Sequence, residues 1–414
     1  MKKPAVPVIM HDFEKQEKEV SLNLGMPGLR IQYFRGPIWG KTNEQIRKQV
    51  MEGNNPITGR PVVQELVEKL TKPLTAEEKK TGELQRNVGP KTYTATPDEL
   101  QRLFLEKRYT DFLPVILPTE EKVAEMLKFT SHDPDEVLGR MNPGSGAGET
   151  WTYTVKDAAV NAVMAGAEPE YVPIILALGS TGITAVNVSD NGFMAGAVIN
   201  GHIRDEIGLN YEEGAVGPYA QANTTIGRAW SLLSINGGNC GKVGTTYMGT
   251  IGNPMNLIGI IIAENEEKSP FKPLSVRRGF KEGENVVTLF TGWGILSAKN
   301  WAADVWGPNM NYPEIIKEIY GTQDGWLFGT CTVLSPPIAD FVRDAGYDTV
   351  EKFTEWVTGQ QPGTKPSFRG GNLNSGIRRA GGTFTVIVTG GSNNNYFSMG
   401  GMVPSQSVQI DQWR

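Results

Sequence analysis

The residues best suited to chemistry form an acidic run, Glu264–Glu267, which directly follows the β-branched stretch Leu257–Ala263. In parallel α/β sheets, ligands bind outside the carboxyl ends of the strands, so carboxylates there could act as acids and bases or bind a hard divalent cation. The alternative is a solvated acidic turn that Arg277 and Arg278 neutralise. The sequence leaves a divalent cation open and identifies no metal site. The catalytic candidates of this run are Glu264, Glu266 and Glu267.

A second group of residues could hold an anionic substrate. Gly390 and Gly391 follow a predicted strand, where backbone N–H groups can approach an anion, although a bland polar turn is the alternative. Asn223 and Arg228 flank the start of a predicted helix, whose N-terminal N–H groups and guanidinium favour a carboxylate or phosphate. Neither a P-loop nor GxGxxG spacing occurs here, so we expect no nucleotide cofactor. The substrate-binding candidates are Asn200, Asn223, Arg228, Gly390 and Gly391.

One cysteine and one histidine complete the catalytic candidates. Cys240 lies in a glycine- and asparagine-rich loop beside Lys242, a setting that could lower the thiol pKa and produce a nucleophile. His202 follows a predicted strand, and Asp205 or Glu206 could orient its ring. For both residues the alternative is a structural role.

The composition is that of an ordinary globular chain. Of 414 residues, 39% are hydrophobic and 21% are charged, and the length suggests two or three domains of about 150 residues each. The net charge of −5 argues against a broad nucleic-acid-binding face. No apolar stretch reaches the roughly 18 residues of a membrane helix, and Pro4 and Pro7 interrupt the apolar start of the chain. We therefore expect a cytoplasmic protein without nucleic-acid or membrane partners.

The order of the predicted elements indicates an α/β fold. We expect parallel or mixed sheets with flanking helices in two lobes, plus an extended N-terminal arm. The expected domains are residues 1–111 for the arm (alternatively a small helical domain), 112–284 for an α/β core and 285–414 for a smaller βαβ-like domain. No internal repeat of fixed period is visible. The predicted strands are Leu29–Phe34, Ile183–Val188, Ala195–Asn200, Leu257–Ala263, Val286–Phe290, Trp326–Leu334 and Thr383–Thr389.

Capping residues and apolar spacing predict the helices. Thr96, Thr119 and Thr154 each stand where a side-chain oxygen can cap a helix N-terminus. The segment Asp133–Glu136 predicts a further helix start by the same logic, and Thr291–Gly294 predicts a turn. The remaining predicted helices are Asn43–Met51, Pro61–Leu70, Tyr171–Leu178, Thr224–Leu233, Tyr312–Tyr320, Ile338–Ala345 and Val350–Val357.

An ordered series of short segments resembles a large bacterial family, the UGSC-like proteins. Members of that family occur beside, or fused to, a small domain with a (Sec or Thr)-Gly-Ser-Cys motif. Because this chain has no such motif, the resemblance implies a large subunit that needs a small partner. Family members tend to have Pro where His202 stands and no Cys at the Cys240 position, which gives more weight to Glu264–Glu267, Asn223 and Arg228. The segments, within residues 112–414, are Gly217-Pro218, Ala222–Ala229, Ala263–Glu267, Ser269-Pro270, Arg278–Phe280 and Ile387–Gly391.

The leading interpretation is the large subunit of a two-component enzyme that acts on a small polar or carboxylate-bearing organic substrate. A thiol from the partner would make thiol-linked reduction, elimination or hydration conceivable. One alternative is a self-sufficient hydrolase or lyase that uses Cys240 or His202. The other is a non-enzymatic binding or scaffold subunit. The expected partners are a small UGSC-like subunit, a further copy of this chain, or both.

Overall fold

The chain is described by a computed structural model, which covers residues 5–38, 40–80, 92–141, 150–186, 193–247, 251–297, 311–323, 329–359 and 383–414. Contacts divide it into two compact units. The first comprises the described residues of Met1–Tyr93 and Lys242–Met248, and the second comprises the remainder. No helix in the described part of the chain is long and apolar enough to cross a membrane.

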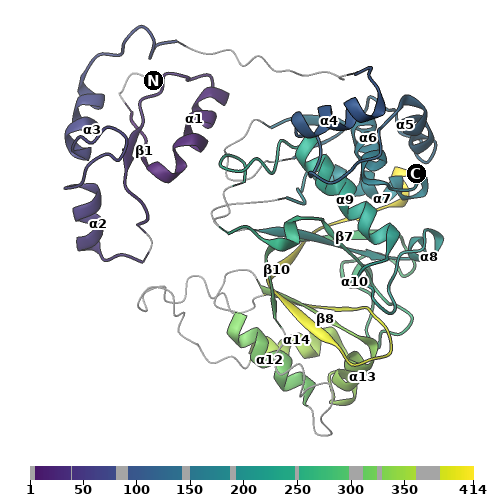
Figure 1. The fold of residues 1–414 in the computed structure, drawn as a ribbon. Helices are drawn as coiled ribbons and strands as arrows, with labels where there is room; N and C mark the ends of the chain where they lie inside the picture. Colours follow the sequence, from purple (N-terminus) through teal and green to yellow (C-terminus); the bar gives the residue numbers. More distant parts are fainter. Residues whose placement is uncertain are drawn as a thin grey trace. The chain divides into compact units, whose positions relative to one another are not determined.

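The first unit contains a parallel pair of short strands, β1 (Val8–Met10) and β2 (Gln32–Phe34). Glu65 is buried on a helix of this unit, and its carboxylate accepts hydrogen bonds from Asn55 Nδ2 at 2.7 Å and Gln32 Nε2 at 3.2 Å. These bonds connect the loop before the helix to β2. The helices are η1 (His11–Phe13), α1 (Glu14–Asn23), α2 (Asn43–Val50) and α3 (Val62–Thr71), drawn in purple in Figure 1.

The second unit is built around a mixed six-stranded sheet with the order β6-β5-β7-β10-β8-β9. The pairs β5–β6 and β8–β9 are parallel, and the other neighbouring pairs are antiparallel. Helices flank this sheet, so the predicted α/β class with a mixed sheet is confirmed. The strands are β5 (Met194–Asn200), β6 (Ile260–Ala263), β7 (Val286–Ser297), β8 (Gly329–Leu334), β9 (Thr383–Val388) and β10 (Tyr396–Gln409).

The two halves of this sheet have the same connectivity. In each half the first strand lies second from the edge, the next strand pairs with it in parallel at the edge, and the third strand lies at the centre. The central strands β7 and β10 pair with each other and join the halves. The crossover helices are α8 (Ile203–Glu206) and α9 (Gln221–Asn236) in the first half, and α13 (Pro336–Asp344) and α14 (Val350–Gly359) in the second.

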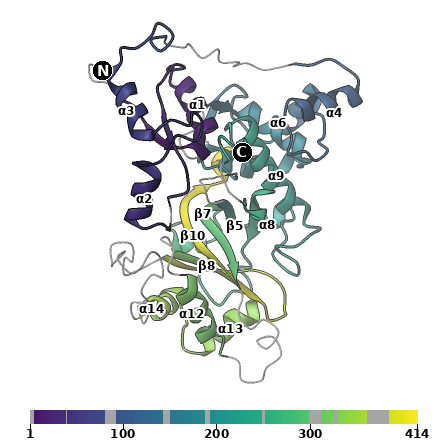
Figure 2. The ribbon, with the colours of Figure 1, turned by 60° about the vertical axis from the view of Figure 1, so that its left-hand side comes forward.

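Helices cover the outer face of each half, as Figures 1 and 2 show. The helices α6 (Val155–Ala165), α7 (Val172–Ser180) and α9 contribute to one core with alternate residues of β5 and β7. The helices α12 (Tyr312–Gln323), α13 and α14 form a second core with β8 and β9. Other elements of this unit are α4 (Pro97–Glu106), α5 (Glu120–Leu127), β3 (Val137–Arg140), β4 (Thr152–Thr154), η2 (Pro169–Tyr171), η3 (Pro254–Asn256), α10 (Leu274–Arg277) and η5 (Asp411–Trp413).

The inner face of the sheet forms a third core, to which all six strands contribute. Side chains alternate between the two faces of a strand, so Met194 and Val198 of β5 point into this core while Ala197 points to the helices. The outer strands meet where both end: Asn265 N donates to Val388 O at 2.8 Å, and Thr389 Oγ1 donates to Ala263 O at 2.7 Å. The sheet is therefore curled. The strand residues of this core are Met194, Val198, Ile262, Phe290, Cys331, Val333, Ile387, Met399 and Met402.

The structure differs from several predictions about single elements. The predicted turn Thr291–Gly294 lies inside β7, and residues 326–328 of the predicted strand Trp326–Leu334 lie outside the described residues. The segment Asp133–Glu136 precedes strand β3 instead of starting a helix. Within the predicted strand Ile183–Val188, residues 187–188 lie outside the described residues and the rest form no strand. There, Ile183 O accepts from Trp230 Nε1 and Ala185 N donates to Ser234 Oγ, so α9 supplies the hydrogen bonds.

Two of the predicted boundaries fall within larger units of the structure. The boundary at residues 284–285 lies between β6 and β7, which belong to the same sheet. Helix α4, included in the predicted N-terminal arm, belongs to the second unit by its contacts.

Candidate functional site

The acidic run after β6 lies beside the ends of β5 and β9. Asn265 makes this junction: its Nδ2 donates to Gly390 O at 3.2 Å and to Tyr211 O at 3.3 Å, and Gly390 N donates to Tyr211 O at 2.9 Å. Asn200 ends β5 and contacts two carboxylates of the run. The folding of the sheet thus brings together segments that are far apart in the sequence. We call Asn200, Arg204, Glu264, Glu266 and Glu267 the acidic cluster.

Asn200 connects two of the carboxylates. Its side chain is completely buried, and Nδ2 donates to Glu264 Oε2 at 2.7 Å and to Glu266 Oε1 at 3.0 Å. Because both acceptors require the amide nitrogen, Oδ1 must point away from them. Asn200 Oδ1 is buried and has no hydrogen-bond partner among the described residues. A buried acceptor without a donor is uncommon in folded proteins, and an ordered water or a ligand group would satisfy it.

Glu264 is the most deeply buried acid of the cluster, with 1% of its surface exposed. It also accepts a hydrogen bond from Leu274 N at 2.7 Å, and Arg277 Nη2 lies 3.6 Å from its Oε1. Burial raises the pKa of Glu264 above the ordinary value, although Arg277 and the hydrogen bonds act in the opposite direction. Glu264 therefore retains a proton at a higher pH than an exposed glutamate does.

Glu266 and Glu267 face different donors. Gly201 N donates to Glu266 Oε1 at 2.7 Å, and 12% of the Glu266 side chain is exposed. Glu267 forms a bidentate pair with Arg204, at 2.7 Å from Nη2 and 3.2 Å from Nη1. This hydrogen bonding from Arg204 lowers the pKa of Glu267. The cluster therefore holds one carboxylate whose pKa is raised and one whose pKa is lowered.

Arg204 holds the cluster together and was not a candidate from the sequence. It is buried, its Nε donates to Gly201 O at 2.8 Å, and its Nη1 donates to Glu264 O. The Arg204 guanidinium lies 4.8 Å from the centre of the Tyr211 ring. The only sequence signal for this role is the position of Arg204 soon after β5, on the short helix α8.

Tyr211 is a second residue that the sequence did not single out. Its hydroxyl donates to Asp205 Oδ1 at 2.6 Å, and this bond raises the pKa of Tyr211 to about 12. Asp205 therefore binds Tyr211, and Glu206 binds Arg414 at 2.5 Å, instead of orienting the ring of His202. His202 itself is exposed at the start of α8.

The substrate-binding candidates of α9 have structural partners. Asn223 Oδ1 accepts from Asn210 N at 2.9 Å, and its Nδ2 donates to Asn210 O at 3.1 Å and Ile261 O at 3.3 Å. Arg228 forms a bidentate pair with Asp111, both bonds 2.9 Å long, and donates to Pro114 O at 2.8 Å. Asn223 lies beside β6, while Arg228 connects α9 to the segment before α5.

The glycine loop after β9 does bind a carboxylate, but one from this chain. Ser392 N donates to Glu213 Oε1 at 3.2 Å, and a Cβ on Gly391 would lie 2.2 Å from the same oxygen. Backbone N–H groups of Glu213 and Ser392 lower the pKa of the Glu213 carboxyl. The backbone N–H that follows the two glycines therefore has an internal carboxylate as its partner, while Gly390 N donates to Tyr211 O.

Cys240 is buried, with 1% of its surface exposed. Its Sγ donates to Gly238 O at 3.3 Å, and its backbone N donates to Ser234 O at 3.0 Å. A reactive thiol needs access and stabilisation of the thiolate, whereas a carbonyl acceptor stabilises the protonated thiol. This arrangement is typical of a structural cysteine.

No group of three or more His, Cys, Asp or Glu side chains in the described part of the chain could hold a metal ion. In the acidic cluster the carboxylates point toward N–H donors of Asn200, Gly201, Leu274 and Arg204. Comparison of the chain with protein-family models, curated proteins and solved structures found no match.

Proposed function

We propose that this chain is the large subunit of a two-component enzyme that acts on a small polar or carboxylate-bearing organic substrate at the acidic cluster. The observation that carries the proposal is the environment of Asn200. Its amide nitrogen connects Glu264 to Glu266, while its Oδ1 is buried without a partner among the described residues. Environments that separate the pKa values of neighbouring carboxyl groups are how proteins assign acid and base roles.

The proposed roles follow from these environments. Glu264, whose pKa burial raises, would donate a proton, and Glu266, partly exposed among N–H donors, would face the substrate and accept one. Asn200 Oδ1 would accept a hydrogen bond from a substrate hydroxyl or amine. Arg204 would position Glu267 and the backbone of Glu264. An acid and a base acting together suit an elimination, in which the base takes a proton from one carbon and the acid protonates the hydroxyl that leaves the neighbouring carbon as water. The reverse reaction is the hydration of the double bond.

The small partner is supported by the sequence resemblance and by the burial of both cysteines. Cys240 and Cys331 are buried, and burial raises the pKa of the Cys331 thiol. Thiol-linked reduction would therefore take its thiol from the partner, with the Thr-Gly-Ser-Cys or Sec-Gly-Ser-Cys motif. For the same reason the geometry does not favour a hydrolase or lyase with Cys240 as nucleophile.

A test uses the chain co-expressed with a small UGSC-like subunit. The complex is incubated in D₂O with a panel of short 2- and 3-hydroxy acids and their unsaturated counterparts, and NMR measures deuterium incorporation and interconversion. We expect turnover by the unchanged complex and a loss of about 100-fold or more in Glu266→Gln, the usual range for removing a general base. The control is Glu282→Gln, an exposed glutamate outside the cluster, which should keep full activity. Equal activity of the two variants would contradict the proposal.

A non-enzymatic binding subunit is the second candidate, and one observation favours it. Phe112 and Tyr219 are both exposed, and both have a φ of 67°, a left-handed conformation that is costly for aromatic residues. Aromatic residues are enriched in protein interfaces, and strained backbone positions cluster at functional sites. Light scattering of the chain co-purified with its partner tests this candidate. A stable complex that shows no turnover, and that dissociates in Phe112→Ser and in Tyr219→Ser, would support it.

A further inference from the structure

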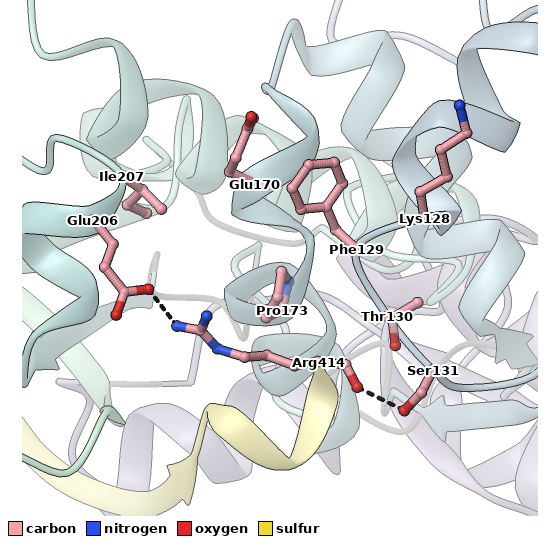
Figure 3. A pocket seen from close by; sticks show the side chains of 9 residues that line it. All are labelled: Lys128, Phe129, Thr130, Ser131, Glu170, Pro173, Glu206, Ile207 and Arg414. Carbon is pink, nitrogen blue, oxygen red and sulfur yellow. Dashed lines mark hydrogen bonds and ion pairs between the residues drawn. The ribbon is translucent and has the colours of Figure 1, made fainter.

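A cavity of about 470 Å³ lies in the second unit, away from the bonds of the acidic cluster. It is bounded by the turn that follows α5, the start of α7, the end of α8 and η5 (Figure 3). Its volume is in the range of small-molecule sites. The lining residues are Lys128, Phe129, Thr130, Ser131, Glu170, Pro173, Glu206, Ile207 and Arg414.

The cavity has an apolar wall that contains an aromatic ring. Phe129, which lines the cavity, is 39% exposed. In Figure 3, Ile207 lies to the left of the Phe129 ring and Pro173, and the Arg414 side chain extends below Pro173 toward Glu206. The ring therefore presents free surface to a bound molecule.

The positive charges of the lining are already neutralised. Arg414 binds Glu206 at 2.5 Å and Asp411 at 2.9 Å, so two carboxylates surround its guanidinium. Lys128 pairs with Glu125 at 2.6 Å. Ser131 Oγ donates to Arg414 O at 2.7 Å, which holds the side of the cavity near η5 in place.

One negative charge remains without a counterpart. Glu170 is exposed at the edge of the cavity and forms no hydrogen bond or ion pair with any residue that the structure describes. In Figure 3, the Glu170 side chain lies next to the Phe129 ring, with its carboxyl group toward the top of the view. A free carboxylate beside an exposed aromatic face is a combination that attracts cations, since the ring face carries a negative quadrupole.

We propose that this cavity binds a small organic cation, an ammonium group carried on an apolar body. The ammonium group binds the Glu170 carboxylate, and the apolar body packs against Phe129, Pro173 and Ile207. Because Arg414 and Lys128 are each paired with a carboxylate, Glu170 is the lining residue whose charge has no partner among the described residues. This site is distinct from the proposed catalytic function. It shares α8 with the acidic cluster, because Glu206 and Ile207 follow Arg204 on the chain.

The test measures binding of benzylammonium to the full chain by isothermal titration calorimetry. We expect saturable binding with one site, and affinity at least about tenfold lower for benzyl alcohol and for benzoate, which lack the positive charge. Glu170→Gln should weaken benzylammonium binding about tenfold, and Phe129→Ala about fivefold. The matched control is Glu168→Gln, an exposed glutamate two positions away that does not line the cavity and should bind like the unchanged chain.

Three results would overturn the inference: no saturable binding of benzylammonium, equal affinity for benzyl alcohol, or equal affinity of the Glu170→Gln and Glu168→Gln chains. Both glutamates are exposed, so neither substitution should impair folding, and a thermal unfolding curve of each variant verifies this. Because the readout is binding of a probe, its outcome is independent of whether the acidic cluster is catalytic.

Discussion

Glu264 and Glu267 are three positions apart in the sequence but lie in opposite environments. Glu264 is buried and lies 3.6 Å from Arg277, which is too far for a hydrogen bond. The cost of removing the Glu264 charge from water is therefore larger than its attraction to Arg277, and the pKa of Glu264 is raised. Glu267 is half-exposed and receives two hydrogen bonds from Arg204. Residue type alone therefore does not determine protonation here, because the neighbouring donors and the solvent decide it.

We predict that these two carboxyl groups titrate on opposite sides of the ordinary glutamate pKa of 4.5. Glu264 has a raised folded-state pKa, so its contribution to stability is complete below pH 4.5 and is lost as the pH rises through the folded value. Glu267 has a lowered folded-state pKa, so its contribution is present above pH 4.5 and is lost as the pH falls. Carbon-13 NMR of labelled glutamate carboxyl groups measures both values.

The assignments come from Glu264→Gln and Glu267→Gln, each of which removes one signal. In Glu264→Gln the loss of stability with rising pH above 4.5 should become smaller. If both carboxyl groups titrated together at the ordinary value, the acidic cluster would lack the separation on which the proposed roles depend.

The sequence predicted part of this site and missed the rest for a physical reason. Their positions at strand ends identify Glu264 and Gly390 as site candidates, because a sheet collects the ends of its strands, and Asn265, beside Glu264, does contact Gly390. Arg228 was assigned to the same site, but Asp111, which is 117 positions away, binds it instead. Arg204 was not assigned, since nothing local distinguishes a buried arginine from an exposed one. Partner choice over such separations depends on tertiary packing.

At the scale of elements, α9 and β6 pack unusually close together. A Cβ on Gly227 of α9 would lie 1.9 Å from the carbonyl oxygen of Gly259, which immediately precedes β6. Ser231 on the next turn of α9 accepts a hydrogen bond from Gly259 N at 2.9 Å. The helix therefore contacts backbone directly, and this contact sets the position at which β6 begins.

We predict that Gly227→Ala lowers the free energy of unfolding by about 1–3 kcal/mol, because the helix must move away from residue 259. Without that contact, the same change inside a helix would raise stability by about 1 kcal/mol, so the sign of the effect is diagnostic. Urea unfolding followed by circular dichroism measures it. The control is Thr224→Ala on the exposed side of α9, which should change stability by less than about 0.5 kcal/mol. A Gly227→Ala chain at least as stable as the unchanged one would refute this packing argument.

Local signals predicted helices better than the central strands. Thr154 caps α6 as expected and forms a capping box with Asp157, and Thr96 and Glu99 form the capping box of α4. Strand β10 was missed because Gly400, Gly401 and Pro404 resemble breakers. In the structure these residues occupy irregular positions, where the register shifts between Gly400 and Met402 and between Pro404 and Ser407. Proline is tolerated in a strand at such bulges, which a sequence pattern does not reveal.

At the scale of the second unit, the repeated connectivity explains why one sheet contains two sets of helices. Each half places a parallel pair at its edge and contributes one long antiparallel strand to the centre. The central pair β7–β10 is the only strand pairing between the halves in the described part of the sheet. The inner core, however, contains residues of all six strands. Packing across the curled sheet should therefore make the halves unfold together.

We predict that a cavity in the second half destabilises the first half as well. Phe353 of α14 is fully buried and packs edge-on against Phe384 of β9, with ring centres 5.5 Å apart. Phe353→Ala should lower the free energy of unfolding by about 3–5 kcal/mol. If the sheet unfolds as one unit, backbone amides of β5 should exchange with solvent more than about 100-fold faster, since about 1.4 kcal/mol corresponds to a factor of ten.

Hydrogen exchange read by mass spectrometry on peptides from β5 and β9 measures this coupling. The control is Phe341→Ala on α13, whose side chain is half-exposed, so β5 exchange should remain near that of the unchanged chain. Faster exchange in β9 with unchanged exchange in β5 would mean that the halves unfold separately. In that case the β7–β10 pairing and the shared inner core would be too weak to connect the halves. Faster exchange in both strands would show that β5 and β9, one from each half of the sheet, open together.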